Sequence, residues 1–155
     1  MKADLSLVLG ANNLPGKTAL EIEMIKAWAR EHITEFDELG FNVRVGTGQD
    51  PGPAFEPFVR RAAIMLTQKK IDMVGYRGSD ITIFEIKARA KLAALGQVVG
   101  YRELWRLSKP ETVNIDLAVI AVGVDPDTER VLIAQGVKIL RVKVPESFLI
   151  PPPKV

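Results

Sequence analysis

Asp72, Glu85 and Lys87 lie within a short stretch of the chain, residues 70–89, and their types suggest a shared chemistry. Asp72 lies near the start of this stretch, and Glu85 and Lys87 lie near its end, two positions apart. Carboxylate oxygens suit Mg2+ or Mn2+, ions that keep most of their waters and also bind phosphate oxygens. A lysine beside such an ion can orient or activate water and stabilise developing negative charge. The three residues therefore predict metal-assisted hydrolysis of a phosphodiester.

Two strands joined by a tight turn are expected to position these side chains. Apolar residues predict a first strand over 71–76 and a second strand over 81–87. The polar and glycine residues at 77–80 predict the hairpin turn between them. Residues two apart on a strand point to the same face, so Glu85 and Lys87 share one side. The hairpin would bring Asp72 close to Glu85. An ordinary solvated surface pair is the alternative, but apolar neighbours predict that both strands are buried, where a carboxylate without a partner or metal is costly.

The remaining pattern predicts an α/β domain with a mixed central sheet flanked by helices. Thr18 and Glu21 fit a capping box at the start of the first helix, and Gly40 fits its end. Asp125 fits the N-cap of the last helix. The expected helices are 18–39, 58–68, 91–108 and 126–135; the other expected strands are 41–46, 114–122 and 137–144, and a turn-rich loop covers 47–57.

Composition limits the chemistry that is available. The 155 residues suit a single domain, 1–155, with a core at about 16–144 and a Pro-rich surface tail at 145–155. No Cys is present, which excludes disulfides, thiol nucleophiles and zinc ribbons. The one histidine, His32, is interpreted as a solvated helical residue. No signal peptide or apolar run long enough to span a membrane is seen, so an intracellular, cytoplasmic protein is expected, and a viral origin is compatible with the sequence.

Charge is divided unevenly along the chain. Residues 60–109 hold 11 Lys and Arg and 4 Asp and Glu, a net charge of +7. The other residues hold 10 basic and 15 acidic side chains, a net charge of −5, so the total of +2 hides a basic middle segment. A basic surface beside a metal site favours a polyanion such as DNA, although solvated lysine-rich helices give similar counts.

The order of these motifs resembles the PD-(D/E)XK nuclease superfamily. Its signature is a metal-binding Asp on one strand and E-x-K on the next, matched here by Asp72 and by Glu85-Ile86-Lys87. The resemblance covers about residues 16–144 and implies a restriction-endonuclease-like α-β-β-β-α-β core with an added C-terminal helix and strand. The family's acidic residue on the first helix would be Glu21, with Glu23 as the alternative, and a plain capping role for Glu21 is equally open.

Two further motifs resemble subgroups of this superfamily. Gln97 and Tyr101 form Q-x-x-x-Y on one helical face, as in RecB-type nuclease domains, where the pair is thought to position DNA. Arg44 and Thr47, within R-V-G-T-G, are similar to a region of archaeal-type Holliday junction resolvases. Coincidence on an amphipathic helix and an ordinary glycine turn are the respective alternatives.

The resemblance implies a Mg2+-dependent, structure-specific DNA endonuclease, with a Holliday junction resolvase as the favoured form. Mn2+ is expected to substitute for Mg2+. Asp72, Glu85 and Glu21 would bind metal, and Lys87 would orient or deprotonate water. Expected DNA contacts come from Arg44, Thr47, Arg89, Gln97, Tyr101 and Arg102.

Partners and rival functions follow from the same resemblance. Four-way or other branched DNA is the expected substrate, and a homodimer is expected because two opposed strands would be cut symmetrically. Residues 49–57 and 58–66 are candidates for the dimer surface or for an arm that contacts the junction. The alternatives are a RecB-type exonuclease or single-strand nuclease, a non-catalytic DNA-binding module, and a small ligand-binding α/β protein.

Overall fold

A six-stranded mixed sheet forms the centre of the computed structural model, which describes residues 2–3 and 5–149. Its strands lie side by side in chain order, and the first four are antiparallel. The last three run parallel, so β4 joins the two halves of the sheet. The strands are β1 (Lys2–Ala3), β2 (Glu38–Val45), β3 (Lys69–Arg77), β4 (Asp80–Ala90), β5 (Ile115–Val124) and β6 (Val137–Arg141).

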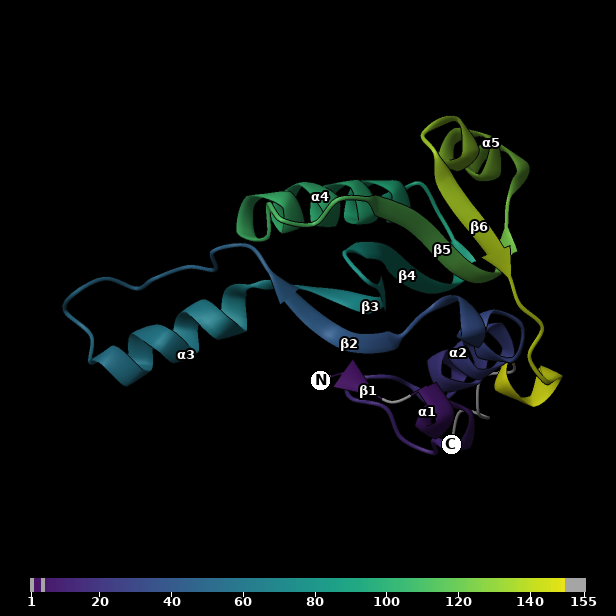
Figure 1. Cartoon of the computed structure of the whole chain (residues 1–155), viewed down its shortest axis with the longest axis horizontal. Helices are drawn as coiled ribbons and strands as arrows, with labels where there is room; N and C mark the ends of the chain where they lie inside the picture. Colours follow the sequence, from purple (N-terminus) through teal and green to yellow (C-terminus); the bar gives the residue numbers. More distant parts are fainter. Residues whose placement is uncertain (1, 4, 150–155) are drawn as a thin grey trace, which may run out of the picture.

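Helices cover both faces of this sheet (Figure 1). One hydrophobic cluster lies under α1 and α2, and a second lies under α4 and α5. The α/β fold class predicted from the sequence is confirmed. The helices are α1 (Leu5–Gly10), α2 (Ala19–His32), α3 (Pro57–Thr67), α4 (Ala93–Ser108) and α5 (Pro126–Ala134), with 3-10 turns η1 (Ile33–Glu35) and η2 (Glu146–Phe148).

The first long helix begins as predicted but ends earlier. Thr18 and Glu21 form the expected capping box, whereas α2 ends at His32 instead of continuing to about residue 39. Gly40 is not its C-cap, because it lies inside β2 opposite Val74. Cross-strand pairing and burial outweigh local helical spacing here, since this segment completes the sheet beside β3.

The rest of the chain agrees with the predicted order, apart from additions at the start. The hairpin turn is confirmed, with Arg77 opposite Asp80, and Asp125 caps α5 through the backbone N–H of Thr128. Neither β1 nor α1 was predicted. Much of the expected Pro-rich tail, residues 150–155, lies outside the described residues. In the described part of the chain, no helix is long and apolar enough to cross a membrane.

One helix stands apart from this layered body. The segment between β2 and β3 forms an extended loop followed by α3, and together they project away from the sheet (Figure 1). No residue of α3 is buried. We call residues 46–68 the arm.

Candidate active site

A fork between β3 and β4 places the first carboxylate. The two strands pair from Arg77 and Asp80 as far as Met73 and Phe84, where their ladder stops. Beyond it, the backbone N–H of Ile86 donates to Asp72 Oδ2 at 3.0 Å. The Asp72 side chain thus accepts a hydrogen bond from a backbone N–H of β4 that has no partner in the backbone of β3. This bond fixes the carboxylate at the point where the two strands separate.

Glu85 and Lys87 lie on the face of β4 that packs toward α4, as their spacing predicts. Lys87 Nζ lies 2.7 Å from Glu85 Oε1, while Phe84 and Ile86 pack into the cluster on the opposite face. The Glu85 residue is only 1% exposed, whereas the Lys87 side chain is 41% exposed. The second carboxylate oxygen of Glu85, Oε2, is buried and has no hydrogen-bond partner among the described residues.

Neighbouring charges and burial shift the protonation of this pair. Burial raises the pKa of Glu85, and the nearby charge of Asp72 raises it further, while Lys87 and Lys17 oppose the change. For Lys87, burial acts to lower the pKa, but the hydrogen bond and charge of Glu85 outweigh it, so the pKa is raised. The carboxylates are therefore close enough to repel one another, which a cation between them would relieve.

Lys17 is the site residue that sequence reasoning missed. Its Nζ lies 2.7 Å from Asp72 Oδ1, and its side chain is only 2% exposed. The loop before α2 is fixed by Asn42, whose Nδ2 donates to the carbonyl of Pro15. Gly16 has a φ of +65°, and a Cβ there would lie 2.1 Å from Asn42 Nδ2. A close backbone approach therefore brings Lys17 to a carboxylate 55 positions away.

A local signal for Lys17 did exist in the sequence. The residue lies directly before the N-cap of α2, at the end of the helix that carries partial positive charge. A lysine is disfavoured at this position unless an acidic partner compensates for it. An unexplained cation at a helix N-terminus can thus indicate a distant carboxylate.

Glu21 takes part in the predicted capping box, and its expected metal role stays a prediction. Its Oε2 accepts from the backbone N–H and the hydroxyl of Thr18, at 2.7 and 2.9 Å, so the carboxylate is used in the capping box. Glu23, the alternative, lies 3.4 Å from Lys26 on the same helix. Residues 2–3 and 5–149 contain no group of three or more acidic, His or Cys side chains that could share a metal.

The Q-x-x-x-Y pair does lie at the site. Gln97 and Tyr101 both lie on α4. Burial raises the pKa of the Tyr101 hydroxyl, and the nearby charges of Glu85 and Asp72 raise it further, while Gln97 acts to lower it. These charges act on Tyr101 because α4 packs over the face of β4 that carries Glu85.

The other predicted DNA contacts are distributed differently. Arg44 donates through Nη1 to the carbonyl of Met65, so its guanidinium holds the end of α3. Thr47 is exposed in the loop that follows β2, and its hydroxyl donates to the carbonyl of Gly48 at 3.3 Å. Arg102 pairs with Glu103 at 3.0 Å, and Arg89 is exposed near the end of β4. Arg44 is thus placed as an anchor for the arm.

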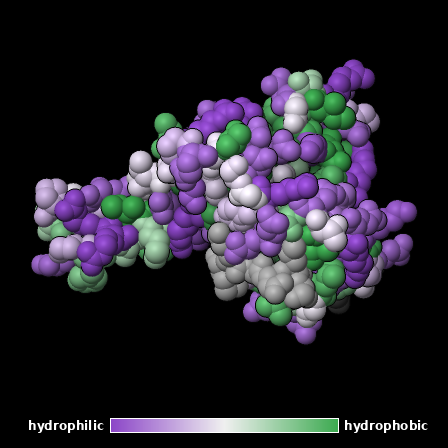
Figure 2. All heavy atoms as spheres, viewed as in Figure 1, coloured by the Kyte–Doolittle hydropathy of each residue, from purple (hydrophilic) through white to green (hydrophobic). Residues whose placement is uncertain are grey.

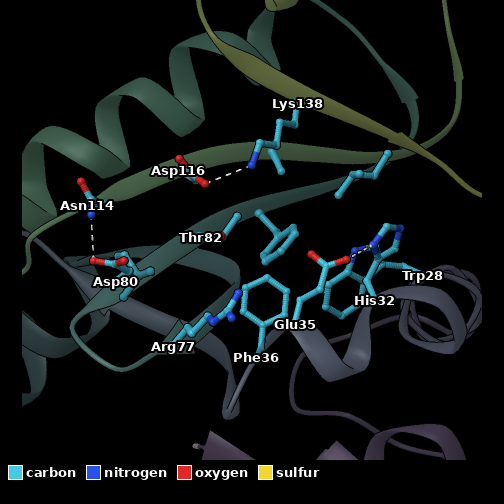
Figure 3. A pocket seen from close by; sticks show the side chains of 14 residues that line it. Trp28, His32, Glu35, Phe36, Arg77, Asp80, Thr82, Asn114, Asp116 and Lys138 are labelled. Atoms are coloured by element: carbon cyan, nitrogen blue, oxygen red, sulfur yellow. Dashed lines mark hydrogen bonds and ion pairs between the residues drawn. The ribbon is translucent and has the colours of Figure 1, made fainter.

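A cavity lies away from the Asp72 and Glu85 carboxylates. It encloses about 550 Å³ between the end of α2 and the starts of β4 and β5, on the sheet face opposite Glu85 (Figure 3). Several of its polar groups are paired with one another, as in Asp116 with Lys138 at 3.0 Å and His32 with Glu35 at 2.7 Å. The cavity gathers no reactive set comparable to the fork, so we place the candidate active site at Asp72 and Glu85.

The residues at the fork fit a divalent cation. Mg2+ is often held by one or two carboxylates, with waters and substrate phosphate completing its shell. Glu85 Oε2 is buried without a partner, and each oxygen of Asp72 keeps a second lone pair beyond its present hydrogen bond. The donor set therefore suits Mg2+ or Mn2+ better than zinc, which prefers His and Cys ligands.

Comparison with known proteins supports the fold. No family model matches the sequence, and a search of curated proteins finds no match. The structure is similar to the crystal structure of a repair endonuclease from Pyrococcus abyssi, with a TM-score of 0.52 and 15% sequence identity. The similarity covers 87% of this chain and 50% of that one, so the chain spans about half the length of the protein it resembles. At this level of identity, the likeness shows a shared architecture.

Proposed function

We propose that this protein is a Mg2+-dependent nuclease that hydrolyses phosphodiester bonds in DNA. The observation that carries the proposal is the buried, unpartnered Oε2 of Glu85, which lies at a strand fork beside Asp72 and two lysines. A carboxylate in this state is costly, and a cation is the partner that would relieve the cost. The architecture shared with a repair endonuclease supports the same chemistry.

Each residue at the fork has a distinct role in this proposal. Asp72 and Glu85 would hold Mg2+, which when bound supplies Lewis acidity toward a phosphate oxygen and its attacking water. Lys87 is 41% exposed, so its ammonium can donate to a phosphate oxygen or to water while it remains beside Glu85. Lys17 is buried and acts through Asp72 by holding the carboxylate in place.

DNA is the polyanion that we propose as substrate. The basic middle segment of the chain includes the strands of the fork and the helix that covers it. Arg89, Arg102, Gln97 and Tyr101 lie on β4 and α4, the same two elements. Contacts with the phosphate backbone would position the duplex and would make the affinity depend on salt.

Four-way DNA junctions are the substrate form that we propose first, on the likeness of the segment around Thr47 to junction resolvases. The second candidate is a RecB-type exonuclease or single-strand nuclease, favoured by the Q-x-x-x-Y pair, because Tyr101 lies near enough to Glu85 and Asp72 for their charges to raise its pKa. These functions differ in their products. A resolvase gives paired symmetric nicks, whereas an exonuclease gives progressive shortening from an end.

The deciding experiment is to incubate the protein with labelled four-way junction, linear duplex and single strand, each with Mg2+ and with Mn2+. We expect metal-dependent cleavage that Asp72→Asn abolishes and that Glu103→Gln leaves unchanged, because Glu103 is an exposed residue of a surface ion pair. Paired nicks on the junction alone would select the resolvase. No cleavage of any substrate by the wild type, with DNA binding intact, would contradict the enzyme and leave a DNA-binding module.

A further inference from the structure

The arm exposes an ordered stripe of apolar side chains. Phe58, Ala62, Met65 and Leu66 follow the spacing i, i+4, i+7 and i+8, which places them on one side of α3. The three large members are 66%, 48% and 70% exposed, and Phe55 just before the helix is 50% exposed. Figure 2 shows that the arm stands clear of the body. Surfaces of this kind usually mark an interface.

The opposite side of α3 is already covered by the arm's own loop. The Thr67 hydroxyl accepts from the backbone N–H of Gln49 at 2.6 Å, and Arg60 pairs with Asp50. Gly48 packs so closely that a Cβ there would lie 2.2 Å from the carbonyl oxygen of Ile64. The loop therefore supports the helix from behind and presents the apolar stripe outward. An isolated helix of this length is marginal in water, so a further partner would stabilise it.

Charge and sequence symmetry indicate what that partner is. The arm contains two acidic and two basic residues, Asp50, Glu56, Arg60 and Arg61, so it has no net charge to attract a polyanion. The stripe is centred on the small residue Ala62, with Phe58 four positions before it and Leu66 four positions after it. In an antiparallel pair of helices crossing at Ala62, Phe58 of each copy would face Leu66 of the other. Such a self-complementary contact is what a two-fold dimer requires.

We propose that α3 is a dimerisation helix that packs its stripe against the same stripe of a second copy of this chain. The small side chain at Ala62 would let the two helices approach closely at the crossing. Each arm would contribute on the order of 500 Å² of surface, about 1,000 Å² in total, which reaches the lower range of specific interfaces. The proposal does not depend on the hydrolysis proposed above, and its test requires neither DNA nor metal.

The first test is sedimentation equilibrium of the wild-type chain from about 1 to about 100 µM, a range suited to an interface of modest size. We expect a reversible dimer that Leu66→Glu converts to a folded monomer, because Leu66 is 70% exposed in the single chain and its substitution disturbs no internal packing. The matched control is Leu107→Glu, which places the same charge on the 82% exposed Leu107 of α4 and should leave the dimer intact. A wild type that stays monomeric, or a Leu66→Glu dimer as stable as the wild type, would overturn the proposal.

The second test uses the absence of native cysteine. Ala62→Cys should form an intermolecular disulfide on mild oxidation, because the two copies of this residue would face each other at the crossing. Ser79→Cys, in the exposed hairpin turn, is the control and should remain monomeric on a non-reducing gel. A dimer that cross-links no better through Ala62→Cys than through Ser79→Cys would contradict the antiparallel arrangement of the arms.

Discussion

The fork and the arm lie close together in the chain, yet they depart from ordinary burial in opposite ways. At the fork, Lys17 and Glu85 are charged groups held almost entirely out of solvent. In the arm, which ends directly before β3, the apolar side chains of Phe58 and Leu66 are 66% and 70% exposed to solvent. Each arrangement is unfavourable for an isolated chain and becomes favourable once a partner is added. At the fork Glu85 Oε2 has no partner, whereas in the arm the apolar stripe has no protein surface packed against it.

This comparison separates two kinds of incomplete surface. The fork is rigid, because Asp72 is held by both a backbone N–H and a lysine, so it can select a small ion and a defined phosphate geometry. The arm stands clear of the body (Figure 1) and is held by its own loop and by Arg44, so its apolar stripe is presented to another protein surface. Perturbing either region should therefore affect a different property, namely activity for the fork and association for the arm.

The largest expected effect is the loss of activity in Glu85→Gln. The amide keeps the size of the side chain but removes the negative charge that would bind a cation, so cleavage should fall by at least about 100-fold. The melting temperature should not fall, because the substitution removes a buried charge with an unpartnered oxygen. Calorimetry and cleavage assays on the same preparation measure both. Parallel loss of stability and activity would instead indicate a structural role for this carboxylate.

The next effect concerns the stability that Lys17 gives to the fork. Lys17→Met should destabilise the protein by about 2–3 kcal/mol, because it leaves Asp72 without its cation, and Asp72 itself is 20% exposed. Lys138→Met removes an ion pair whose partners are 63% and 57% exposed, and should cost less than about 1 kcal/mol. Urea denaturation provides both values. Equal losses of unfolding free energy in the two variants would show that the buried Lys17–Asp72 pair contributes no more to stability than an exposed ion pair.

Glu85 and Lys17, the residues changed in these two variants, differ in how well the sequence predicted their place in the site. Glu85 and Lys87 were predicted to lie on the same side of their strand because its period is two, and the hairpin was expected to bring Asp72 close to Glu85. Lys17 was not found, since its partner is distant in the sequence and its approach depends on the contact between Gly16 and Asn42. Local patterns specify what one element presents, but they do not specify which loop packs against it.

Glu21 shows the reverse case, in which a local pattern was sufficient. The pattern with Thr18 predicted a capping box, and the structure shows that capping box. This interaction lies within one helical turn and needs no long-range closure, so it could be predicted from the sequence, whereas the metal role implied by the family resemblance stays a prediction. The order of the strands was also predictable from local patterns, because each strand showed a clear run or alternation of apolar residues.

A smaller effect tests how Lys17 is delivered to the fork. Gly16→Ala should destabilise the protein by about 1–3 kcal/mol, because φ is +65° and the new Cβ would overlap Asn42 Nδ2. Gly96→Ala is the control, since this helical position has open space around it and should gain about 0.5–1 kcal/mol. Thermal denaturation of both variants measures the difference. A neutral Gly16→Ala would show that the loop before α2 can shift without cost.

The smallest effect lies in the arm and concerns Asp50. Hydrogen bonds from Arg60 and from the backbone N–H of Gly52 lower the pKa of Asp50 from 3.8 to about 2. Because this pKa is lower in the folded than in the unfolded chain, the pairing stabilises the arm above about pH 4 and is lost as the pH falls toward 2. Carboxyl NMR titration should give a midpoint near 2 in the wild type and one closer to 3.8 in Arg60→Gln. A wild-type midpoint near 3.8 would mean that the loop is not tied to α3. The apolar stripe would then lack the pairing between Arg60 and Asp50 that supports it from behind.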